Sequence, residues 1–133
     1  MNEEEKIIKK LRKSAMSYLA QYEVSVQQFE KTMKRKLSNL KANLNDFDEI
    51  KIIKNLKNEM KLAKFIDDNR FAETKIRSIR SQGGSERFIY AKLKEKGISN
   101  DIIKSAIHIV DEGYENAEMI AAVNFMKKKN IGI

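Results

Sequence analysis

The chain of 133 residues has no cysteine, no proline and no tryptophan, and it has only five glycines. Without cysteine the chain can form neither a disulfide scaffold nor a zinc site with cysteine ligands. The absence of proline leaves few positions that would interrupt a helix, and no segment sustains the alternation of β-branched residues that is typical of strands. The sequence therefore predicts an all-α fold.

Long hydrophobic runs are also missing. No apolar stretch approaches the roughly 20 residues that a membrane-spanning helix needs. The first ten residues, MNEEEKIIKK, are acidic and then amphipathic, unlike the cationic and then apolar pattern of a secretory signal. We therefore expect a cytoplasmic protein without a membrane partner.

Basic residues outnumber acidic ones, with 27 lysines and arginines against 19 aspartates and glutamates and a net charge of +8. The excess is densest over residues 61–98, which contain ten cations and five anions. An excess of this kind favours an anionic partner, such as nucleic acid, an acidic protein surface or a membrane surface.

Capping residues and glycines predict where the helices begin and end. Each predicted helix carries apolar residues at a spacing of three to four. Helix starts are predicted from side chains that cap a first turn, at Asn2, Ser25, Asp46, Asp67, Ser85 and Ser99. Helix ends are predicted at Gly83–Gly84, Gly97 and Gly113, which leaves a seventh helix over residues 117–129.

Two segments of the chain are similar to each other. Residues 25–36 run parallel to residues 85–96, with a serine cap at one end and a lysine at the other. The match predicts tandem three-helix repeats, which form an elongated and curved modular array. The predicted units are an N-terminal helical extension at 1–13, a first repeat at 14–62, a second repeat at 63–113, and the first helix of an incomplete third repeat at 114–133.

Asp67 and Asp68 raise the alternative of a metal-dependent nuclease. A two-metal site needs several converging carboxylates, but adjacent residues at a helix start splay by roughly 100°. The plainer interpretation is that Asp67 caps a helix and Asp68 lies in its positively polarised first turn. His108 is the sole histidine, and no second histidine exists to complete a metal set. We therefore predict no catalytic residue, no metal site and no cofactor.

The basic residues are the stronger candidates for function. Any single lysine is more often part of a solvated surface, but here the cations gather on two similar units. Phe71 and Phe88 lie among them and are predicted to be core residues, whereas Tyr90 fits either core or surface. The candidate contacts to a partner or to DNA are Lys34, Arg35, Lys75, Arg77, Arg80, Arg87, Lys94 and Lys96.

The segment Ile66-Asp67-Asp68-x-x-Phe71-Ala72 opens the second predicted unit. In this segment the chain resembles the RecX family of bacterial RecA regulators, because the segment is similar to that family's most recognisable motif. A weaker first-repeat pattern is found in Ala15-x-x-Tyr18-Leu19 with Ser25, Phe29 and Met33. The residues that the resemblance assigns to the structural motif of the second repeat are Asp67, Asp68, Phe71, Ala72, Gly83, Leu93 and Gly97.

The resemblance implies a function that spacing alone could not supply. Proteins of this family bind the RecA–DNA filament and restrain its growth, its ATPase and its strand exchange, which tempers recombinational repair and the SOS response. It implies a RecA filament as partner, weak contact with single- or double-stranded DNA, and no small-molecule substrate. A stand-alone basic module that binds DNA or RNA remains the alternative.

The chain departs from the family pattern in its last part. Family members usually carry a third repeat, and here only its first helix is present. We expect that helix to be poorly anchored or to pack against a neighbouring chain.

Overall fold

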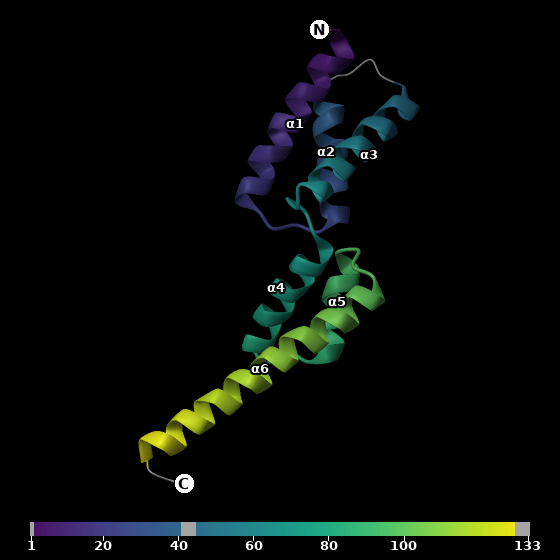
Figure 1. Ribbon diagram of the computed structural model, residues 1–133. Helices are drawn as coiled ribbons and strands as arrows, with labels where there is room; N and C mark the ends of the chain where they lie inside the picture. The colour runs from purple at the N-terminus through teal and green to yellow at the C-terminus, as the bar shows by residue number, and fades with distance from the viewer. Residues whose placement is uncertain (1, 41–44, 130–133) are drawn as a thin grey trace.

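The computed structural model describes residues 2–40 and 45–129, and this part of the chain is helical without any strand. The predicted all-α fold is therefore confirmed. The helices follow one another in two groups of three, which lie end to end and give the molecule an elongated shape (Figure 1). Their bounds are α1 Glu3–Gln21, α2 Val26–Asn39, α3 Asp46–Leu62, α4 Asp68–Ser81, α5 Glu86–Glu95 and α6 Asn100–Lys129.

Each group of helices encloses its own hydrophobic core. The first core contains residues of α1, α2 and α3, with Leu11, Phe29 and Met33 almost completely buried. The second core contains residues of α4, α5 and the first part of α6, with Ile76 and Ile89 fully buried. Because the apolar face of each helix packs against the other helices of its own group, the two groups form two separately packed units.

The sequence similarity between the two units corresponds to equivalent positions in the two cores. Phe29 in α2 and Ile89 in α5 are both fully buried, as predicted from their alignment. Ser25 caps α2 in a capping box with Gln28, and Ser85 accepts a hydrogen bond from the backbone N–H of Phe88 at the start of α5. The serine caps and the core positions that follow them are confirmed.

The cap of α3 differs from the prediction by one residue. The side chain of Asn45 accepts a hydrogen bond from the backbone N–H of Asp48 at 2.8 Å, so Asn45 is the N-cap of α3. Asparagine is as good a cap as aspartate, so Asn45 is well suited to this position.

The prediction that a helix ends at Gly113 is wrong, because α6 continues through this residue to Lys129. Gly113 does not adopt the left-handed conformation that Gly83 and Gly97 adopt at the ends of α4 and α5. A glycine within a helix costs only about 1 kcal/mol relative to alanine, which the surrounding helix tolerates. The predicted sixth and seventh helices are therefore one element.

The start of the chain is continuous in the same way. Helix α1 crosses the predicted boundary between residues 13 and 14, and both Ile7 and Ala15 are buried in the first core. The other unit boundaries, and the assignment of residues 114–133 to a third repeat, stay predictions.

Candidate partner-binding surface

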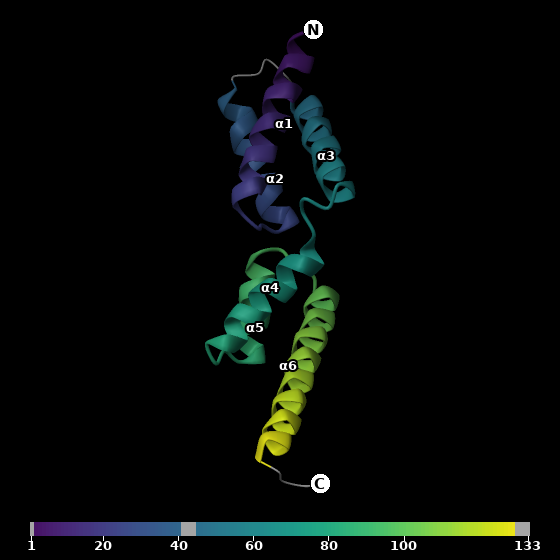
Figure 2. The same cartoon turned by 60° about the vertical axis from the view of Figure 1, so that its left-hand side comes forward.

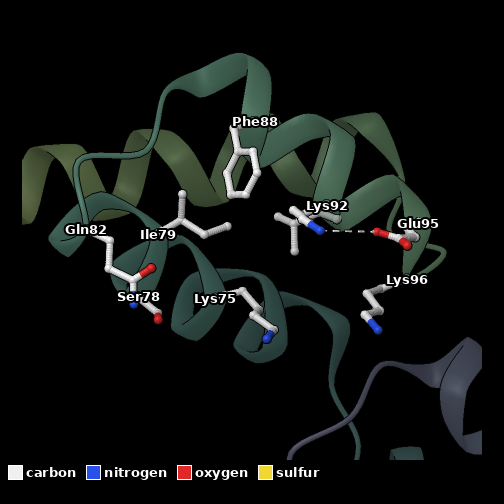
Figure 3. A pocket seen from close by; sticks show the side chains of 9 residues that line it. Lys75, Ser78, Ile79, Gln82, Phe88, Lys92, Glu95 and Lys96 are labelled. Atoms are coloured by element: carbon white, nitrogen blue, oxygen red, sulfur yellow. Dashed lines mark ion pairs between the residues drawn. The ribbon is translucent and has the colours of Figure 1, made fainter.

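A basic groove runs between α4 and α5 on the second unit. It has a volume of about 440 Å³. Figure 3 shows that Lys75 and Gln82 reach it from α4, whereas Phe88, Lys92 and Lys96 reach it from the other side. The sequence alone does not predict this groove, because its two walls come from helices that come together only in the folded protein.

Phe88 supplies an exposed aromatic ring in this basic groove. Its side chain is 46% exposed, so the prediction that it belongs to the core is wrong. The ammonium group of Lys92 lies 5.5 Å from the centre of the ring, which is within the range of a cation–π contact. Ile89, the next residue, takes the core position instead, and Tyr90 packs partly buried against the same core.

Charge in the groove is only partly compensated. Lys92 lies 4.0 Å from the carboxylate of Glu95, while Lys75 and Lys96 have no ion-pair partner in the described part of the chain. A groove with three ammonium groups and an exposed aromatic ring can bind an anionic segment through charge and ring contact together. The basic sequence pattern had indicated Lys75 and Lys96, but Lys92 was not among the predicted contacts.

The other predicted contacts do not all lie on this groove. Arg87 and Lys94 are seven residues apart on α5 and therefore share a different, exposed face of that helix. Arg77 is exposed and pairs with Glu73 one turn earlier at 3.5 Å. Lys34 and Arg35 are exposed on α2 of the first unit, so the fold does not bring all the predicted cations together.

Arg80 is held by polar contacts within the second unit. Its guanidinium donates two hydrogen bonds to the Asp111 carboxylate, at 3.1 and 2.9 Å, and a third to the carbonyl of Gly84. This bidentate pair joins the end of α4 to α6. Because the pair is only half-buried, it stabilises the second unit moderately. Arg80 therefore has a structural task that the sequence pattern did not show, and a role in partner contact stays a prediction.

The motif residues of the second unit are mainly structural. Phe71, Ala72 and Leu93 are buried in the second core. Gly83 and Gly97 have positive φ angles of 80° and 82°, which glycine adopts without strain. These five residues fix the positions of α4 and α5 and so shape the two walls of the basic groove.

Asp67 and Asp68 cap two different helices. The Asp67 carboxylate accepts hydrogen bonds from the backbone N–H groups of Asn69 and Arg70, which confirms its predicted role as the cap of α4. The Asp68 carboxylate instead accepts from the backbone N–H of Val26 at 2.9 Å, at the first residue of α2. Asp68 thus joins the second unit to the first, a role that its position in the α4 sequence did not predict.

Two further polar contacts complete this junction. The Ser25 hydroxyl donates to the backbone carbonyl of Lys96 at 2.7 Å, so the cap of α2 also meets the end of α5. Arg70 donates to the Glu23 carboxylate at 2.8 Å and to the carbonyls of Lys64 and Phe65. The junction therefore fixes the basic groove relative to the first unit.

Burial at the junction raises the pKa of the Asp68 carboxyl above its ordinary value. The hydrogen bond from Val26 and the positive charge of Lys61 oppose this effect, while the neighbouring Asp67 adds to it. Desolvation is the largest of these causes, because the carboxylate lies between the two units.

Within residues 2–40 and 45–129, no three carboxylate or imidazole side chains come close enough to hold a metal ion. No helix there is both long and apolar enough to cross a membrane.

Comparison with known families gives a match that falls on the unit that contains the groove. Residues 67–107 match the family model described as RecX, second three-helix domain. The second unit is a RecX-family domain. The RecX resemblance predicted from Asp67, Asp68, Phe71 and Ala72 is thereby confirmed, and the matched range spans α4, α5 and the start of α6. Neither the curated proteins nor the solved structures give a match to the chain.

Proposed function

We propose that this protein is a negative regulator of RecA that binds the RecA–DNA filament and restrains its growth, its ATPase and its strand exchange. The observation that carries the proposal is the RecX-family domain at residues 67–107. A regulator of this kind acts in the cytoplasm, where it tempers recombinational repair and the SOS response. It needs no catalytic residue, cofactor or small-molecule substrate of its own, because the ATPase belongs to the filament.

The arrangement of charge supports this function. The basic groove between α4 and α5 and the exposed cations Lys34 and Arg35 on α2 lie on two units of one elongated molecule. A filament offers a repeating anionic surface over a long distance, so an elongated molecule with cations on both units can contact it at more than one point. The polar junction at Asp68 and Ser25 fixes the spacing between these points.

The test is a titration of the protein into RecA that is hydrolysing ATP on single-stranded DNA. We expect the ATPase rate to fall as the protein is added, and to fall less at higher salt because charge drives the contact. An unchanged rate at saturating protein would overturn the proposal.

A second titration separates binding to the filament from binding to bare DNA. We expect the protein to prefer the RecA filament over random duplex DNA at the same salt concentration. Equal affinity for the two would instead support a stand-alone nucleic-acid-binding module.

A further inference from the structure

The second half of α6 extends beyond the core of the second unit. Val110 is the last residue of this helix that is buried among those whose exposure is described, and the Tyr114 hydroxyl donates a hydrogen bond to the carbonyl of Arg77 at 3.3 Å. Every side chain from residue 115 to 128 whose exposure is described is exposed. Figures 1 and 2 both show this end of α6 continuing past α4 and α5.

This extension exposes large apolar side chains. Met119 is 68% exposed and Ile120 is 62% exposed, and Val123 and Met126 follow at 44% and 40%. A single helix of this length is marginal in water without a packed face. An apolar stripe on a projecting helix therefore indicates a surface that packs against a partner.

The charges along the extension change sign from one end to the other. Residues 112–118 contain three acidic side chains and no cation, residues 119–126 contain no charged side chain, and Lys127 and Lys128 follow. The extension thus has an acidic end, an apolar centre and a basic end. A parallel copy would place like charges together, whereas an antiparallel copy would place opposite charges together.

The helical spacing aligns these features on one face. Glu115, Met119, Val123 and Lys127 follow one another at intervals of four residues, so they form one line along the helix. In an antiparallel pair centred on residue 121, Glu115 of each copy meets Lys127 of the other. Met119 of each copy then meets Val123 of the other, which makes the contact self-complementary and closed under a two-fold axis.

We propose that the α6 extension is a self-association surface, and that its occupant is the extension of a second copy of this chain in antiparallel orientation. Ile120 and Met126 lie on either side of the line and widen the apolar contact. The resulting dimer would present two RecX-family domains at opposite ends of the paired helices. This surface is separate from the basic groove, and it holds or fails independently of any action on RecA.

The first measurement is sedimentation of the whole chain at concentrations from about 1 to 100 μM, a range that covers weak and moderate dimers. We expect the unmodified protein to shift from monomer to dimer across this range. A monomer at every concentration would overturn the proposal.

Charge reversal then tests the orientation. Glu115→Lys places two lysine pairs at the antiparallel contact, and Lys127→Glu places two glutamate pairs there. We expect each change to raise the dimer dissociation constant about tenfold or more, since two attractive pairs become repulsive. The double variant restores opposite charges and should return the constant to near the original value.

Mixing the two single variants gives the sharpest result. In an antiparallel heterodimer both charge pairs become attractive again, so the mixture should associate more tightly than either variant alone. The matched controls are Glu118→Lys and Lys128→Glu, which make the same charge changes on side chains turned by roughly 100° or more from the mean direction of the four side chains on the line. Failure of both the double variant and the mixture to recover, or equal weakening by the controls, would overturn the antiparallel pairing.

Discussion

Asp67 and Asp68 are neighbours in the chain, but their carboxylates stabilise different helices. Asp67 immediately precedes the first residue of α4 and caps that helix. Asp68 caps α2 in the other unit. The side chains of adjacent residues point in different directions at a helix start, and this divergence lets one pair serve both units. The same divergence keeps the two carboxylates from converging on a shared metal site.

The role of Asp68 can be tested by two substitutions. Asp68→Ala leaves the Val26 N–H without its acceptor, and we expect a loss of about 1 kcal/mol in the free energy of unfolding. Asp68→Asn keeps an oxygen at the same place and should cost less. Chemical denaturation measures both, and an alanine variant as stable as the asparagine variant would contradict the capping role.

The asparagine variant also makes a prediction about pH. Because burial raises the pKa of Asp68 in the folded state, the folded protein holds its proton more strongly than the unfolded chain. The contribution of this group to stability is therefore fully present below the ordinary aspartate pKa of about 4, and it is lost as pH rises through the raised value. We expect Asp68→Asn to gain stability relative to the unmodified protein over that interval. A difference between the two that does not vary between pH 3 and 7, about the range in which carboxyl groups titrate, would contradict it.

Whether a glycine ends a helix depends on the backbone conformation that it adopts, as the contrast between Gly97 and Gly113 shows. At Gly97 the φ angle is positive and an added Cβ would overlap the side chain of Gln27, so the residue ends α5 at the junction. At Gly113 nothing lies near an added Cβ, and the helix continues. The two glycines look equivalent in the sequence, because both follow a helical pattern.

This contrast predicts opposite effects for one substitution. Gly113→Ala should raise the free energy of unfolding by about 0.5–1 kcal/mol, since alanine loses less backbone entropy in a helix. Gly97→Ala is the matched control and should lower it by about 1 kcal/mol or more, because alanine is strained at positive φ. Thermal unfolding followed by circular dichroism measures both changes. Destabilisation by Gly113→Ala would show that α6 is not continuous at this residue.

Local sequence signals predicted most of the fold, whereas features that depend on long-range contacts could not be predicted from them. Ser25, Asp67 and Ser85 were predictable as caps because each acts on backbone within three residues of itself. The hydrogen bond from Arg80 to Asp111 spans 31 positions of the chain, and that from Val26 to Asp68 spans 42. No local pattern contains such a pairing. Basic composition likewise indicated a charged surface, but only the fold placed Lys92 beside Phe88 in the groove.

At the level of the whole protein, the fold changes which cations should be tested against RecA. Reversal of Arg77, Arg80 and Arg87 together would break the pair between Arg80 and Asp111, so lost binding could reflect damage to the second unit. The groove lysines avoid this difficulty, since Lys75 and Lys96 make no ion pair among the described residues and Lys92 makes only a long one. Their ammonium groups can change sign while the core stays intact.

We therefore expect the combined variant Lys75→Glu, Lys92→Glu and Lys96→Glu to lose inhibition of the RecA ATPase, with an affinity for the filament weaker by about tenfold or more. It should also lose part of the salt dependence of binding, because fewer counterions are released. The matched control reverses three exposed lysines of the first unit, Lys9, Lys51 and Lys54, and lowers the net charge by the same amount. Filament binding measured by fluorescence anisotropy across salt concentrations compares the two. If both variants lose the same affinity, the overall charge of the molecule governs the contact and the groove has no special part in it.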